Sequence, residues 1–133
     1  NPAYGTLDKL PRFGHCGSHG LRSAVDETAP RLVLSGHVHE HYGLMKLGQT
    51  FFLNPSNFGS VQTMEGEQVG GFFATINLQP VDDGQKFVRE VAWKRLAKGK
   101  ITDICSVKID KKYRASEEIL DEAQFSAMGS FLL

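Results

Sequence analysis

The sequence predicts an α/β fold, and three observations support that prediction. A short helical pattern spans residues 18–29, an apolar run of strand length follows it over residues 31–35, and alternating apolar patterns fill residues 71–109. Helical periodicity followed by several strands is typical of an α/β domain. The chain has 133 residues, of which 41% are hydrophobic, so we expect one domain with a small core.

The first third of the chain is predicted to contain a loop, a helix and a strand. Proline and glycine interrupt residues 1–14, which favours irregular structure. Ser18 is a suitable helix N-cap, and the helix is expected to run to about Ala29, where Pro30 stops it. The apolar run at residues 31–35 is long enough for a buried strand.

Antiparallel strands are predicted for most of the remaining chain. A hairpin is expected over residues 44–53 with its turn at Gly48, and residues 54–70 are predicted to be a loop rich in serine, asparagine and glycine. Three further strands are expected over residues 71–79, 86–96 and 101–109. Their alternation predicts that one set of side chains in the second of these strands faces the core: Phe87, Val91 and Trp93.

A helix is predicted over residues 116–132. Ser116 is a possible N-cap, and the acidic Glu117 and Glu118 suit the positive end of a helix dipole. An apolar stripe that includes Ile119, Met128 and Phe131 follows. This stripe either packs on the chain's own sheet or docks against a partner.

Composition excludes several classes of protein. The fifteen basic and fifteen acidic residues balance, which gives no sign of a nucleic-acid surface. No apolar run reaches membrane-spanning length. Cys16 and Cys105 lie far apart in sequence, and we expect free thiols rather than a disulfide, as in a cytoplasmic protein.

Residues 36–40, Gly-His-Val-His-Glu, are the strongest functional signal. They follow the predicted strand at residues 31–35, so the histidines lie at a sheet edge. If the backbone is extended there, His37 and His39 point to the same side. Neutral imidazole is the commonest metal ligand in proteins, although a bare pair of this kind is more often a structural or surface feature.

Several segments together resemble the calcineurin-like metallophosphoesterases, in particular their small single-domain branch. The resemblance covers residues 1–59 and is carried by Pro2-Ala3-Tyr4-Gly5, His15-Cys16-Gly17-Ser18, residues 30–40, Tyr42-Gly43 and residues 50–56. It implies hydrolysis of phosphomonoesters or phosphodiesters with two divalent metal ions (Mn, Fe or Zn). His37 and His39 would each bind one ion, and the chain would be the C-terminal half of a two-sheet α/β sandwich, extended by an antiparallel ribbon and a terminal helix.

The resemblance also implies that part of the site lies elsewhere. The family's early Asp-x-His, Gly-Asp and Gly-Asn-His-Asp elements have no counterpart in this sequence. We therefore expect the complete protein to include an N-terminal segment, or a second copy of the chain, that supplies the other ligands, and the chain alone to be inactive. The expected segments are 1–66 (the metallophosphoesterase core half), 67–110 (the terminal strands) and 111–133 (the helix). The alternative is a non-catalytic structural or interaction subunit that retains part of the fold.

Other polar residues near the motif have two possible roles. His15 lies before the predicted helix start, where backbone amides favour an anion, so it either faces a phosphate as a catalytic residue or hydrogen-bonds the helix cap. Glu40 and His41 either line the mouth of the site or lie on its rim. The amide of Asn54 is expected to bond backbone groups of the loop. Tyr42 and Phe58 either stack on an aromatic substrate or fill the core.

Overall fold

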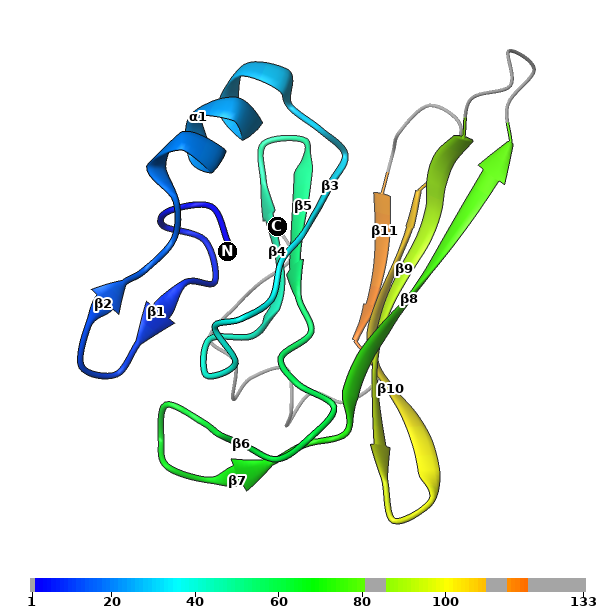
Figure 1. Ribbon diagram of the computed structural model, residues 1–133. Helices are drawn as coiled ribbons and strands as arrows, with labels where there is room; N and C mark the ends of the chain where they lie inside the picture. The colour runs from blue at the N-terminus through cyan, green and yellow to red at the C-terminus, as the bar shows by residue number, and fades with distance from the viewer. Residues whose placement is uncertain (1, 81–85, 110–114, 120–133) are drawn as a thin grey trace.

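The computed structural model describes residues 2–80, 86–109 and 115–119, and these form a mixed α/β structure with one short helix and several small sheets. Strands make up most of the regular structure (Figure 1). The elements in chain order are β1 (Lys9–Leu10), β2 (Gly14–His15), α1 (His19–Thr28), β3 (Leu32–Leu34), β4 (Gly43–Leu47), β5 (Thr50–Asn54), β6 (Val61–Gln62), β7 (Gln68–Val69), β8 (Phe72–Pro80), β9 (Lys86–Ala97), β10 (Lys100–Ile109) and β11 (Ala115–Ile119). Within these residues no helix has the length and apolar character needed to cross a membrane.

The predicted helix is confirmed, with Ser18 as its N-cap and its end just before Pro30. The Ser18 hydroxyl accepts a hydrogen bond from the backbone N–H of Leu21, which satisfies one of the free amides at the helix start. At the other end Ala29 adopts a left-handed conformation and its N–H bonds the Val25 carbonyl. Only Val25 of this helix is buried, so α1 packs through a narrow face.

A three-stranded sheet in the order β3-β5-β4 lies at the centre of the molecule. Strand β3 runs parallel to β5, whereas β4 pairs with β5 as the antiparallel hairpin that the sequence predicts. All five residues of β5 are buried. Phe51 and Leu53 belong to one core cluster and Phe52 to another, so β5 is covered on both faces.

Four antiparallel strands form a second sheet in the order β11-β10-β9-β8. The predicted inward set of β9 is confirmed, because Phe87, Val91 and Trp93 are all buried. The register shifts once between β8 and β9 and once between β9 and β10, where Ile104 is the extra residue. This second bulge interrupts the alternation along β10, so the neighbouring residues Ile104 and Cys105 are both buried.

Strand β11 contradicts the predicted terminal helix over residues 115–119. Its backbone pairs with β10 from Cys105 to Ile109. The hydrogen-bonding groups along that edge of β10 are satisfied by this pairing, and such tertiary pairing overrides a local capping signal at Ser116. The rest of the predicted helix, residues 120–132, lies outside the described residues.

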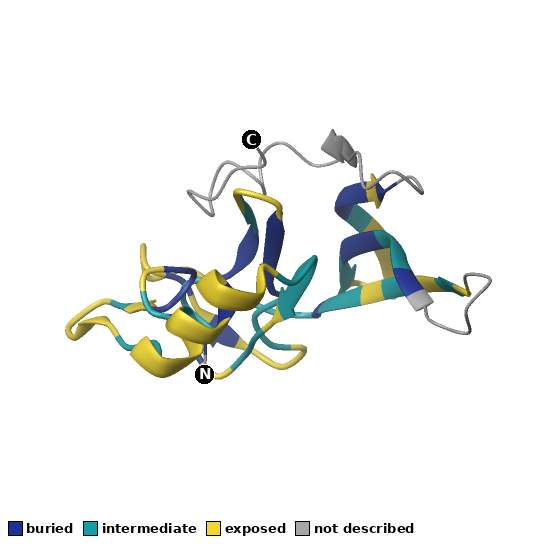
Figure 2. Cartoon of the chain, turned by 90° about the horizontal axis from the view of Figure 1, so that it is seen from above, coloured by how far each residue is buried: buried dark blue, intermediate teal, exposed yellow. Residues whose placement is uncertain are grey.

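Two core clusters divide the structure into layers. The larger cluster joins Leu44, Phe51 and Leu53 of the three-stranded sheet to Trp93 and Val107 of the four-stranded sheet. The smaller cluster lies on the opposite face of the three-stranded sheet, where Phe52 meets α1 and the N-terminal segment. Figure 2 shows buried strands on both sides of the larger cluster.

Short ribbons occur in two segments that the sequence predicts as loops. Strands β1 and β2 pair within residues 9–15, and β6 and β7 pair within residues 61–69. Each ribbon has only two residues per strand, which is too short for a periodic pattern to show in the sequence. Both cysteines are free, as expected, with Cys105 buried and Cys16 half-buried.

Candidate functional site

A buried carboxylate organises the N-terminal segment. The Asp8 side chain is 0% exposed. One of its oxygens, Oδ2, accepts hydrogen bonds from the backbone N–H groups of Gly5 (3.1 Å) and Gly17 (2.8 Å). The other oxygen, Oδ1, lies 2.6 Å from Nδ1 of His15. Asp8 therefore joins two turns of the chain to one imidazole ring.

The charge of Asp8 is stabilised by these partners. Burial alone opposes ionisation and raises the pKa of the carboxyl group. The hydrogen bonds from His15, Gly17 and Gly5, together with the attraction of the His15 ring, outweigh burial and hold the pKa of Asp8 below its usual value. The carboxylate is thus ionised at neutral pH.

His15 is fixed on one side and open on the other. Its Nδ1 faces Asp8, which leaves Nε2 as the nitrogen available to a ligand, and its side chain is 34% exposed. The Tyr4 ring lies 5.3 Å from the imidazole and stacks in turn on His19 at 3.9 Å. A carboxylate behind an imidazole sets the ring's tautomer and orientation, which is the arrangement of a general acid or base.

The structure thus refines the two roles predicted for His15. The His15 ring forms a hydrogen bond with the Asp8 carboxylate and not with the helix cap. The Asp8 carboxylate in turn accepts a hydrogen bond from the backbone N–H of Gly17, just before the cap. Asp8 itself is absent from the sequence prediction. A single aspartate in a loop interrupted by glycine and proline has no periodic neighbours, and its seven-residue separation from His15 matches no helical or strand repeat.

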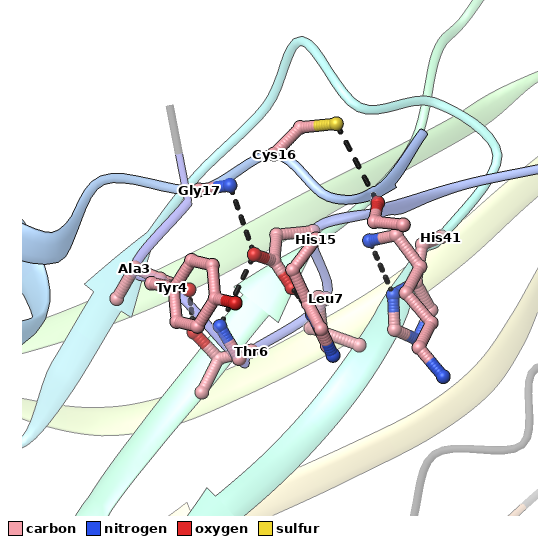
Figure 3. A network of polar contacts seen from close by, with 12 residues as sticks. Ala3, Tyr4, Thr6, Leu7, His15, Cys16, Gly17 and His41 are labelled. Atoms are coloured by element: carbon pink, nitrogen blue, oxygen red, sulfur yellow. Dashed lines mark hydrogen bonds and ion pairs between the residues drawn. The ribbon is translucent and has the colours of Figure 1, made fainter. Parts of the chain in front are cut away.

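His41 connects the β1–β2 ribbon to the histidine segment. Its Nδ1 accepts a hydrogen bond of 2.9 Å from the backbone N–H of Lys9, the residue after Asp8. Burial lowers the pKa of His41, and the attraction of Asp8 opposes this only in part. His15 also acts on the His41 charge, so the two rings lie near each other, as Figure 3 shows.

Asn54 fixes the backbone of the histidine segment, residues 36–41, by hydrogen bonds. Its side chain is fully buried, and its amide nitrogen donates to the carbonyls of Val38 (2.6 Å), His41 (3.0 Å) and Leu7 (3.4 Å). Ser56 adds a second tie, since its hydroxyl donates to the His39 carbonyl at 2.8 Å. The predicted structural role of Asn54, which is to satisfy backbone groups of the loop, is confirmed.

The two histidines of the motif differ in backbone and in exposure. His37 has a φ of +77°, so the run from His37 to His39 is not extended, and the sequence premise of an extended backbone is wrong. A left-handed residue other than glycine costs about 1–2 kcal/mol, which the bonds from Asn54 and Ser56 help to offset. His37 is exposed and His39 is half-buried, with its Nδ1 3.5 Å from the Asn57 amide nitrogen.

Metal-binding capacity is limited in the part of the chain that the structure describes. There, no group of three or more histidine, cysteine, aspartate or glutamate side chains is placed to hold a metal ion. A stable site commonly needs four ligands for zinc and more for other divalent ions. The described residues therefore do not by themselves fit a pair of metal ions.

The aromatic residues near the motif separate into two groups. Tyr42 is 4% exposed and packs against Phe72 and Trp93, so it fills the core, and burial raises its pKa. Phe58 is 58% exposed and touches Phe73 edge-on. Glu40 is half-buried beside the histidines.

Comparison with protein-family models, with curated proteins and with solved structures gave no match to this chain.

Proposed function

We propose that the complete protein is a metal-dependent phosphoester hydrolase and that this chain contributes one side of its active site. In this proposal His37 and His39 bind metal, and His15 faces the substrate. The observation that carries the proposal is the Asp8–His15 pair, whose fixed imidazole lies beside a histidine-bearing loop that Asn54 holds in place.

The position of the loop supports this assignment. Strands β3 and β5 run parallel, and the histidine segment follows β3 while Asn54 ends β5. Both therefore lie at the carboxyl edge of the parallel pair, which is where α/β proteins commonly place their ligands. The proposed fold, the C-terminal half of a metallophosphoesterase sandwich, is compatible with two sheets that share one core cluster.

His15 would serve as the proton donor in this site. Asp8 is ionised, and its negative charge stabilises the positive charge that the His15 ring carries when both ring nitrogens hold a proton. Nε2 is then the donor toward the leaving-group oxygen of a phosphoester. A positioned general acid contributes about 10²–10⁴-fold to the rate.

In this proposal, the other side chains that bind the metal ions lie outside residues 1–133 of one chain. A pair of divalent ions supplies an activated water and neutralises the charge on the phosphoryl oxygens. We propose that the missing ligands belong to a further segment of the polypeptide or to a second copy of the chain. Among the described strands β3 pairs on one side only, and an open strand edge of this kind accepts additional strands.

The test compares the 133-residue chain with a polypeptide that carries the upstream segment. With Mn²⁺ or Zn²⁺ and 4-nitrophenyl phosphate or its diester, the chain alone should show no turnover, and the longer protein should be active. In the longer protein His39→Ala should lower kcat/KM by about 10²-fold or more, and His15→Ala by about 10²–10⁴-fold. The control is Ile101→Ala, a change at a 59% exposed position on strand β10 of the other sheet, with an effect of at most about twofold.

Two results would contradict the proposal. Reproducible turnover by the purified 133-residue chain would mean that the ligands are assigned wrongly. An inactive longer protein that still assembles with a partner would favour the alternative, an interaction subunit, for which the open edge of β3 is the supporting observation.

A further inference from the structure

A cavity of about 510 Å³ lies next to the histidine segment. Its walls come from the turn of the β1–β2 ribbon, from the turn of the β6–β7 ribbon and from Glu40. Glu40 lies between His39 and His41 in the chain, so the cavity borders the proposed active site. Figure 1 shows that the turns of both ribbons point away from the four-stranded sheet, although β7 leads directly into β8.

Two apolar side chains from different ribbons are exposed in this cavity. Phe13 is 78% exposed and Met64 is 39% exposed, and both line it. A single exposed apolar residue is common on protein surfaces. Here an aromatic ring and a thioether face one space from two separate turns, which is a favourable environment for a planar aromatic group.

The walls are held by hydrogen bonds at their bases. The backbone N–H of Lys9 donates a hydrogen bond to the His41 ring, which connects the β1–β2 ribbon to the histidine segment. The neighbouring Asp8 carboxylate forms a hydrogen bond with the His15 ring. In the other ribbon the Thr63 carbonyl accepts the Gly66 N–H at 3.0 Å, and the Thr63 hydroxyl accepts the Glu67 N–H at 3.1 Å. These hydrogen bonds thus shape both turns that line the cavity.

Two charged groups in the cavity have no partner among the residues that the structure describes. They belong to Glu40, a half-buried residue, and Arg12, an exposed one, and neither side chain makes a hydrogen bond or an ion pair there. A carboxylate accepts hydrogen bonds only, so an N–H group of a ligand suits Glu40. The cavity therefore combines an aromatic wall with a hydrogen-bond acceptor.

We propose that this cavity binds a planar aromatic group that carries an N–H donor on its edge, with the ring against Phe13 and Met64 and the N–H on Glu40. That this group is the organic part of a phosphoester substrate rests on the proposed function. The binding itself does not, because it needs neither phosphate nor metal.

Indole is a suitable probe because it is planar, uncharged and carries one N–H. We would label the methionine methyl groups with carbon-13 and follow them by NMR as indole is added to the 133-residue chain. The Met64 methyl signal should move upfield and saturate at millimolar indole, while that of Met45, which packs against the smaller core cluster, should stay in place. Because the sequence has three methionines, Met64→Leu assigns the signal.

Three variants test the contacts. Phe13→Ala should weaken indole binding about fivefold, whereas Phe58→Ala, which removes another exposed phenylalanine away from the cavity, should leave it unchanged. 1-Methylindole lacks the N–H donor and should bind about threefold to tenfold more weakly than indole, and Glu40→Ala should abolish that difference.

The proposal is overturned if the Met64 signal does not saturate, if Met45 moves equally, or if Phe13→Ala and Phe58→Ala bind indole alike. A second measurement uses the longer protein, where Phe13→Ala should lower kcat/KM for an aryl phosphate about fivefold more than for an alkyl phosphate. If indole binds as expected and no phosphoester is hydrolysed, the cavity is confirmed and the proposed function is wrong.

Discussion

The two faces of the three-stranded sheet are stabilised by different interactions. On the face toward the four-stranded sheet, apolar side chains form the larger core cluster, and the backbone groups of β8–β11 pair in antiparallel ladders. On the other face and at its carboxyl edge, three polar side chains satisfy the backbone of irregular segments: Asp8, Asn54 and Ser56. The first region resists change through packing and the second through a few specific hydrogen bonds.

This difference separates stability from function within one small structure. A packed cluster shares its energy over many contacts, so any large deletion there affects the whole fold. A loop held by two or three side chains keeps its shape only while those side chains remain. We therefore expect changes in the cluster to affect global unfolding, and changes at Asp8 or Asn54 to affect mainly the geometry around His15 and His39.

The largest effect is expected for Trp93→Ala. Trp93 is 0% exposed, stacks on Phe72 and donates its indole N–H to the Pro55 carbonyl. Its loss leaves a cavity between the two sheets and should lower the free energy of unfolding by about 3–5 kcal/mol, as measured by urea denaturation. Ile101→Ala, at a position that is 59% exposed, is the control and should change stability by less than about 0.5 kcal/mol. Equal effects of the two changes would mean that the sheets do not pack through Trp93.

A smaller and more local effect is expected for Asn54→Ala. Three carbonyl groups, those of Leu7, Val38 and His41, would lose their donor. The expected cost is about 2–3 kcal/mol, and amide hydrogen exchange should increase around residues 37–41 while β8–β10 stay protected. Asn57→Ala is the matched control, because the Asn57 side chain accepts the Gly59 N–H and makes one long contact with the His39 ring, and no hydrogen bond joins it to a carbonyl of residues 37–41 in the described structure. Uniform loss of protection across both sheets would contradict the separation of the two regions.

The smallest effect is expected at Asp8, and it depends on pH. Because the folded-state pKa of Asp8 lies below its usual value of 3.8, its contribution is complete above about pH 4 and is lost as the pH falls through the lower, folded-state pKa. Asp8→Asn should therefore destabilise the protein by about 1–2 kcal/mol at pH 7. The difference in the free energy of unfolding between Asp8→Asn and the unchanged protein, measured by urea denaturation, should shrink as the pH is lowered toward 2.

The same variant has a spectroscopic consequence. An asparagine amide that donates to Nδ1 of His15 would place the ring proton on Nε2, the reverse of the tautomer that Asp8 favours. Nitrogen-15 NMR of the imidazole should detect the exchange. A constant stability difference from pH 7 to pH 2, or an unchanged tautomer, would show that Asp8 does not hold His15 as we describe.

The regular elements could be predicted from the sequence because their signals are local. Ser18 and Pro30 bound the helix, Gly48 marks the hairpin turn, and the alternation around Trp93 identifies its buried face. The helix predicted from Ser116 onward fails over residues 115–119 because the open edge of β10 lies nearby in space and not in sequence.

Prediction of the site was less complete, and the reason is again distance along the chain. The motif drew attention to His37 and His39, whose metal-binding role stays a prediction. The chemistry of an asparagine next to a loop predicted the role of Asn54, which the structure confirms. The Asp8–His15 pair and the left-handed backbone of His37 depend on turns that carry no periodic pattern. The contact of Lys9 with His41 spans 32 residues and leaves no trace in either local sequence.

Asn54 has a further consequence for the chemical lifetime of the protein. Asparagine ages to aspartate when the nitrogen of the next residue attacks the side-chain carbonyl, and at this position the next residue is Pro55, whose nitrogen carries no hydrogen. Conversion to aspartate would replace the donor group by a negatively charged oxygen that faces three carbonyl oxygens. The repulsion between these oxygens would displace the segment that contains His39. The proline that ends the strand thus also protects the amide on which the shape of the loop depends.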